Sequence, residues 1–133
     1  MTTHEPITTS DEEIHRKVMH LGFSEVVAAL TGVLGERLVA FISNVAETRA
    51  VREWASGDRP VRQRSTVEPR LRLALQTALM LAEHDSPAVV QAWFQGSNPQ
   101  LDDRVPATVL REGDFSQTAP DILAAARAFL AGG

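Results

Sequence analysis

The sequence predicts an all-α fold, and three observations support this prediction. Apolar residues make up 44% of the 133 residues but aromatic residues only 5%, so leucine, valine and alanine must fill the interior. Apolar residues recur at helical spacing, and few of the alternating β-branched runs that mark strands are present. Glycine and proline divide the chain into segments of helical length. A chain of this length forms one compact domain, or two small lobes that share a core.

The N-terminal part predicts a polar leader followed by two helices. Residues 1–9 are polar and show no period, which indicates a disordered leader. Ser10 and Glu13 have the spacing of a capping box, so we expect the first helix to begin at Ser10 and to end before Gly22. A second apolar helical segment follows at residues 24–34.

Two short helices joined by a turn are predicted next, at residues 36–42 and 48–55. A helix-turn-helix has this order, and its second helix lies in the major groove of DNA. Val51 and Trp54 share one face of the second helix, which suits the small core that fixes the angle between two such helices.

The second of these helices opens a basic part of the chain. Residues 48–72 carry seven basic and three acidic residues, although the net charge of the whole chain is −4. Such a patch can attract phosphate because exposed charges beyond about 10 Å are largely screened. Glu47 and Glu53 repel phosphate and favour the alternative, a helical hairpin whose arginines are only solvated. The residues expected to contact DNA are Thr48, Arg49, Arg52, Arg59, Arg62 and Arg64.

The second half of the chain predicts further helices. Residues 61–67 are basic and irregular, which indicates a linker. The helix that follows, to about Glu83, has apolar residues over more than half of its circumference, so we expect it to be the most buried one. Ser86 and Pro87 form an N-cap and first-position pair that opens the next helix. The terminal helix is expected to begin at residues 118–121.

A pattern of helix ends occupies residues 92–113: an aromatic pair, a break at Gly96, an Asn-Pro turn, and a short helix between Pro106 and Gly113. It resembles the C-terminal toxin-binding domain of the Xre/MbcA/ParS-like antitoxins. The signature of that domain is a Trp-Leu/Phe pair, an Asn-Pro, a Leu, a Pro, a Leu and a Gly. The matching residues are Trp93, Phe94, Asn98, Pro99, Leu101, Pro106, Leu110 and Gly113. Residues 51–60 also resemble the end of the recognition helix in Xre-type regulators.

The resemblance covers about residues 34–133 and implies a homodimeric antitoxin. The chain's own residues predict a leader with a first helix (1–22), which matches no motif of the family, and the resemblance implies an Xre-like helix-turn-helix module (23–64) and a helical toxin-binding domain (65–133). It further implies that the partner is a RES-domain toxin that degrades NAD, that the antitoxin covers the toxin's active site, and that the helix-turn-helix binds operator DNA. The implied toxin contacts are Phe94, Asn98, Pro99, Leu101, Phe129, Leu130, Gly132 and Gly133.

Two features of this region allow more than one interpretation. Trp93 and Phe94 are adjacent and point about 100° apart on a helix, so they cannot both face one narrow core seam. We therefore expect Trp93 in the core and Phe94 in a surface patch. The terminal helix, with Phe129 and Leu130 on its apolar side, is either a packing helix or a plug for a cleft in a partner, and the resemblance favours the plug.

The sequence carries no recognisable catalytic pattern. It has no cysteine, which excludes disulfides and thiolate metal sites. His15 and His20 are five residues apart, no His/Glu spacing suits zinc, and the Asp102-Asp103 pair is best explained as a solvated turn. We therefore expect a binding protein, not an enzyme, with no cofactor and no metal.

The remaining expectations concern location and the rival classes of function. The first residues lack a secretory signal, and no segment approaches the roughly 20 apolar residues that span a bilayer, so we expect a cytoplasmic protein. One rival is a stand-alone Xre-like transcriptional regulator whose C-terminal domain only dimerises. Another is an interaction module without DNA binding.

Overall fold

The structure, a computed structural model, describes residues 6–62 and 65–132. This part of the chain is all-α, as predicted, and contains no strand beyond one isolated bridge between Asn98 and Arg104. The elements in chain order are α1 (Pro6–His20), α2 (Phe23–Leu34), α3 (Glu36–Ser43), α4 (Thr48–Ser56), α5 (Val67–Ala82), α6 (Pro87–Gln95), the 3-10 turn η1 (Pro99–Leu101), α7 (Pro106–Glu112) and α8 (Phe115–Leu130).

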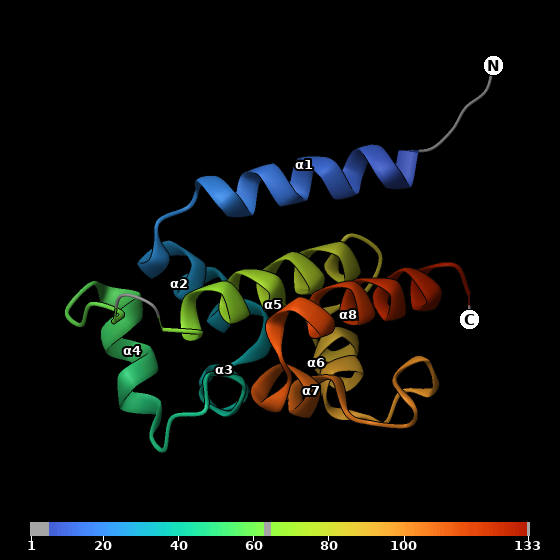
Figure 1. Cartoon of the computed structure of the whole chain (residues 1–133). Helices are drawn as coiled ribbons and strands as arrows, with labels where there is room; N and C mark the ends of the chain where they lie inside the picture. Colours follow the sequence, from blue (N-terminus) through green and yellow to red (C-terminus); the bar gives the residue numbers. More distant parts are fainter. Residues whose placement is uncertain (1–5, 63–64, 133) are drawn as a thin grey trace.

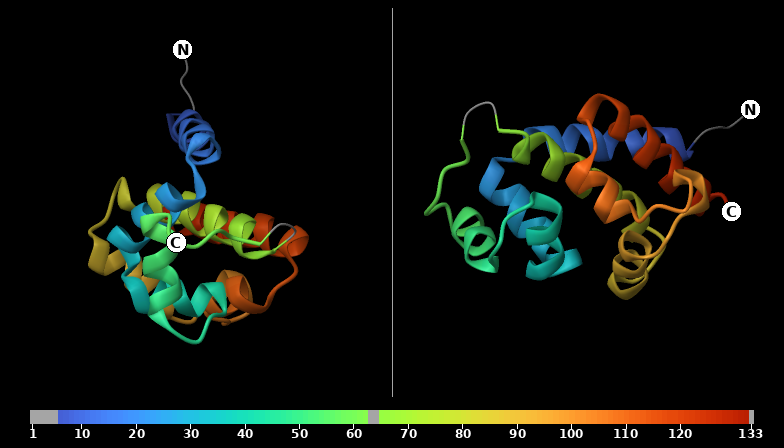
Figure 2. Two further views of the ribbon diagram at one scale, coloured as in Figure 1. Left: turned by 90° about the vertical axis from the view of Figure 1, so that its left-hand side faces the viewer. Right: turned by 60° about the horizontal axis from the view of Figure 1, so that its bottom comes forward.

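Helix α5 is the centre of the fold (Figure 1). It packs against α1, α2, α3, α6, α7 and α8, and most of its side chains from Leu71 to Leu81 are buried. The helix is therefore central, as predicted, and it has more buried residues than any other described helix, although the shorter α3 has a larger buried fraction. Figure 2 shows α1 lying on one side of the body, where it packs on α5.

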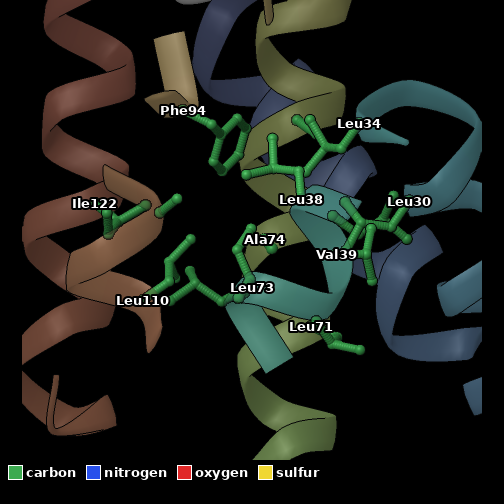
Figure 3. Close-up of a cluster of buried hydrophobic side chains, with 14 of the residues drawn as sticks. Leu30, Leu34, Leu38, Val39, Leu71, Leu73, Ala74, Phe94, Leu110 and Ile122 are labelled. Atoms are coloured by element: carbon green, nitrogen blue, oxygen red, sulfur yellow. The ribbon is translucent and has the colours of Figure 1, made fainter. Parts of the chain in front are cut away.

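The buried side chains form one cluster that extends from Ile14 on α1 to Ala126 on α8. Figure 3 shows labelled side chains from α2, α3, α5, α7 and α8 directed into the same interior as Phe94. The cluster crosses the boundary between the predicted units 23–64 and 65–133, so these units share their core. The division of the chain at this boundary stays a prediction.

Several helix ends lie where the sequence predicts them. Helix α4 ends at Gly57, whose φ of 83° lies in the left-handed region, where a residue without a Cβ is favoured. Asn44, with φ of 61°, ends α3 in the same way. Helix α6 begins with Pro87 in its first turn, and the Ser86 hydroxyl accepts a hydrogen bond from the N–H of Val89 at 3.3 Å.

The start of α1 differs from the prediction. The helix begins at Pro6, so the expected capping box at Ser10 is wrong and the part of the leader from Pro6 onward is helical. Proline suits the first turn of a helix because its missing N–H would have no partner there. The Ser10 hydroxyl instead donates to the two carboxylate oxygens of Glu83, at 2.8 and 2.9 Å. Residues 1–5 lie outside the described part of the chain.

The start of the terminal helix also differs. Helix α8 begins at Phe115, and Thr118 lies inside it. The cap is Asp114, whose carboxylate accepts a hydrogen bond from the N–H of Ser116 at 3.0 Å. Pro120, which the sequence suggested as a first-turn residue, therefore lies inside α8 near its N-terminal end.

Two arginines, one on α5 and one on α7, bind the C-terminal end of α3. Arg70 on α5 directs Nη1 at the carbonyl oxygens of Ile42 and Ser43, at 3.4 and 3.5 Å. Arg111 on α7 donates to the carbonyl oxygen of Phe41 at 3.2 Å and stacks over the Phe41 ring at 4.5 Å. Partial burial, and then the nearby charge of Arg111, lower the pKa of Arg70. Cations are favourable at a helix C-terminus, so this pair fixes α3 on the C-terminal half of the chain.

Candidate nucleic-acid and partner interfaces

The helix pair α3 and α4 has the small shared core that the sequence predicts. Val39, Val51 and Trp54 are buried, and Val45 in the turn packs partly against the core. Trp54 packs edge to face on the ring of Phe23 from α2, with ring centroids 5.8 Å apart. Burial of this face of α4 leaves its opposite face in solvent, and that face carries the arginines.

Two arginines of α4, Arg49 and Arg52, and Arg59 just beyond its end are exposed but bound to carboxylates. Arg49 Nε donates to Glu53 Oε2 at 2.9 Å, and Arg59 Nη2 lies 2.8 Å from Glu53 Oε1. Arg52 Nη1 donates to Glu36 Oε1 at 2.9 Å and to the hydroxyl of Thr48 at 3.1 Å. The expected DNA-binding arginines are therefore brought together on one face, but each of these three has an internal carboxylate partner.

These contacts shift the pKa of the groups that share them. Hydrogen bonds from Arg49 and then Arg59 lower the pKa of the Glu53 carboxyl, because both favour its charged form. The hydrogen bond with Glu53 raises the pKa of Arg49. Glu53 is therefore a carboxylate at neutral pH, and it lies between two guanidinium groups.

The other expected DNA contacts are less well defined. Thr48 is half-buried, and its hydroxyl accepts the hydrogen bond from Arg52. Arg62 is exposed beyond the end of α4. Arg64 lies outside the described residues, so the expectation for it has no structural counterpart.

The antitoxin-like signature around η1 forms a tight structural loop. The Asn98 carboxamide oxygen accepts the N–H of Gln100 at 2.9 Å, and the Asn98 N–H donates to the carbonyl of Arg104 at 3.0 Å. Asn98 is buried and Pro99 is exposed, while Asp102 and Asp103 are exposed with φ of 57° and 63°. Asn98 therefore holds the loop, and Pro99 is the exposed member of the Asn-Pro pair.

Two of the expected toxin contacts lie in the core. Phe94 is completely buried, so the expectation that it lines a surface patch is wrong. Trp93 is also buried, because α6 packs against α2 and α5 as well as against α7 and so has more than one buried face. Leu101 is 2% exposed and packs in the same core, so it cannot contact a partner as the structure stands.

The last turn of α8 presents the remaining expected contacts. Phe129 is 38% exposed and Leu130 is half-buried, and Gly132 follows with φ of 96°. The same helix is anchored by Ile122 and Ala126, which are fully buried. Gly133 lies outside the described residues.

The sequence reasoning missed a surface that the start of α8 creates. Phe115 is 44% exposed and, with Met19 of α1, borders an apolar groove of about 330 Å³ whose floor includes Leu73 of α5. The signal for it was the Asp114-x-Ser116 pair, which caps α8 one turn earlier than Thr118 would. Because the sequence predicts a helix start at residues 118–121, Phe115 lies outside the predicted helix.

Comparison of the chain with protein-family models, curated proteins and solved structures found no match. Within residues 6–62 and 65–132, no three His, Asp or Glu side chains gather as a metal site would require. No helix in these ranges is long and apolar enough to cross a membrane.

Proposed function

We propose that this chain is a cytoplasmic, homodimeric antitoxin that binds a RES-domain toxin and closes the toxin's NAD-binding active site. The observation that carries this proposal is the last turn of α8. There the exposed ring of Phe129 and the half-buried Leu130 extend from a helix that Ile122 and Ala126 anchor in the core. A rigid, exposed aromatic side chain is typical of the residues that dominate the energy of protein interfaces.

The signature loop supports this proposal by its position. Helix α8 packs against η1, so the loop that Asn98 holds together lies beside α8. We infer that the signature residues in the core position this surface and do not themselves contact the toxin. The contacts that we propose are Pro99, Phe129, Leu130 and Gly132.

The test uses the purified chain and the product of the neighbouring gene, which the proposal expects to be a RES-type toxin. Phe129→Ala should weaken inhibition of NAD breakdown by about 10-fold or more, the effect of losing an interface hot spot. Phe115→Ala is the matched control, since it removes the same ring from the other end of the same helix at similar exposure. Full inhibition by Phe129→Ala would exclude the last turn of α8 as the contact. Loss of inhibition by Phe115→Ala alone would place the contact at the groove between α1, α5 and α8.

We propose DNA binding by α4 as a second function, because one specific arrangement favours it. Burial of Val51 and Trp54 directs Arg49 and Arg52 outward from a short helix that follows a turn. Figures 1 and 2 show α4 at the opposite end of the molecule from the last turn of α8, so DNA and a toxin would not compete for the same surface.

Gel retardation with the DNA upstream of the chain's own gene tests this second function. Arg52→Ala should weaken binding by about 1–3 kcal/mol and relax base preference, whereas Arg62→Ala should weaken binding to all duplexes and reduce the salt slope by about one. Retardation without toxin inhibition would identify a stand-alone regulator. Inhibition without retardation would identify an interaction module that lacks DNA binding.

A further inference from the structure

The carboxylate of Glu53 on α4 binds two exposed arginines, Arg49 on the same helix and Arg59 just beyond its end. Each oxygen of Glu53 serves a different guanidinium: Oε2 accepts from Arg49, and Oε1 accepts Nε of Arg59 at 2.9 Å and lies 2.8 Å from its Nη2. We propose that Glu53 is an internal counter-ion that occupies N–H donors of Arg49 and Arg59 and so lowers the affinity of α4 for duplex DNA. This inference rests on the second function proposed above.

The geometry makes the carboxylate a direct competitor of phosphate. An arginine binds a carboxylate or a phosphate through the same pairs of N–H donors, and Arg59 offers Nε and Nη2 together to Glu53. These donors cannot bind a phosphate oxygen while Glu53 holds them. Glu53 therefore competes with phosphate for Nε of Arg49 and for Nε and Nη2 of Arg59, but not for the other N–H groups of these guanidiniums.

The exposure of these ion pairs indicates that a DNA phosphate can displace the Glu53 carboxylate. The side chains of Arg49 and Arg59 are 72% and 48% exposed, and Glu53 is 28% exposed. Ion pairs this exposed contribute little to stability, so a phosphate can replace the carboxylate. Once replaced, however, the Glu53 charge remains on the DNA-facing side and repels the phosphates. Glu53 should therefore weaken binding without abolishing it.

Glu36 allows the effect of one bound arginine to be compared with the effect of two. It binds one arginine, Arg52, at 2.9 Å, whereas Glu53 binds two. Each arginine that becomes free to neutralise a phosphate adds about one unit to the slope of log affinity against log salt. Neutralising Glu36 should thus free at most one further phosphate contact and neutralising Glu53 at most two, according to how far the carboxylates still hold the arginines when the wild type binds DNA.

The experiment measures fluorescence anisotropy of two labelled duplexes over a salt series. One duplex carries the DNA upstream of the chain's own gene and the other is an unrelated sequence of the same length. Glu53→Gln should tighten binding to both roughly 10-fold at low salt and steepen the slope by up to about two, and Glu36→Gln should steepen it by up to about one. Glu47→Gln is the control, because Glu47 is the residue that precedes α4 and its substitution changes the net charge equally.

The outcomes separate this inference from DNA binding itself. Equal effects of Glu53→Gln and Glu47→Gln would overturn the inference, because net charge alone would explain them. If the wild type binds DNA and Glu53→Gln binds it with the same affinity, the inference is also overturned, while DNA binding as a function stands. Absence of binding by wild type and by both variants would overturn the inference and DNA binding together. Matching circular dichroism spectra and melting temperatures would show that each variant is folded.

Discussion

The rings of Trp93 and Phe94, which are adjacent in the sequence, pack edge to face with their centroids 5.1 Å apart. Both are buried, Phe94 completely. Phe94→Ala should therefore lower the free energy of unfolding by about 3–5 kcal/mol, the usual cost of a large core cavity, and Trp93→Ala should do the same. Urea unfolding followed by circular dichroism measures both losses. A Phe94→Ala protein of near wild-type stability would contradict the buried position of the ring.

Trp93→Phe is the control for this prediction, because the indole N–H of Trp93 is buried and meets no acceptor among the described residues. Leaving such a group unpaired costs about 1–3 kcal/mol, and phenylalanine removes the group while it keeps a ring in the core. Trp93→Phe should thus be much less destabilising than Trp93→Ala. Equal losses would show that the N–H is paired in solution.

Gly113 should not tolerate a side chain. A Cβ at this position would collide with the Thr118 hydroxyl and with the carbonyl oxygen of Val109. We expect Gly113→Ala to lower the free energy of unfolding by about 1–3 kcal/mol, the usual cost of overpacking. Gly32→Ala is the control: Gly32 is exposed inside α2, and nothing lies within 4 Å of the added carbon. Gly32→Ala should stabilise the helix by up to about 1 kcal/mol, so the two melting temperatures should move in opposite directions.

The loop after η1 contains backbone strain that glycine would relieve. Asp102 and Asp103 are consecutive residues with φ of 57° and 63°, a region that side chains with a Cβ disfavour. Asp103→Gly should raise the free energy of unfolding by about 0.5–1 kcal/mol, whereas Asp103→Ala, which removes the same charge, should lower it. Thermal melts of the two variants check this prediction. If both variants melt at a higher temperature than the wild type, the effect comes from the lost charge and not from the backbone.

The ion pairs of Glu53 should be visible in its titration. Because Arg49 and Arg59 lower the pKa of this carboxyl in the folded protein, their stabilisation is fully present above the ordinary pKa of glutamate. It is lost as the pH falls through the lowered, folded pKa. Carbon NMR of the side-chain carboxyl should give a pKa below the ordinary value, and Arg59→Ala should raise it. A Glu53 that titrates normally in the wild type would contradict the pairing.

Local signals in the sequence were sufficient for much of the fold. The ends of α3 and α4 at Asn44 and Gly57 follow from residues that adopt the left-handed conformation, and α6 follows from its Ser-Pro start. The start of α8 was placed too late, because a proline at Pro120 looked like a first-turn residue while the true cap is Asp114.

The candidate sites were harder to predict because they depend on contacts between distant residues. Arg49 and Glu53 are four residues apart on one helix, so their ion pair is visible in the sequence. The pairing of Arg52 with Glu36 is not, since it depends on the angle between α3 and α4. The burial of Phe94 likewise could not be predicted, because it depends on the contacts that α6 makes on more than one side.

The hydrogen bonds from Arg70 and Arg111 to the end of α3 limit which parts of the chain can be exchanged with those of another protein. Both arginines come from the C-terminal half, yet the helix that they hold precedes α4 and helps to set its angle. A chimera that joined residues 23–64 to the C-terminal half of another protein would lose these contacts. The carbonyl groups of Ile42 and Ser43 would then be left to water, whereas the Phe41 carbonyl would keep its bond from the N–H of Asn44. Exchange of α4 alone, with α3 and both arginines retained, is therefore the better route to a chain with a different α4 surface.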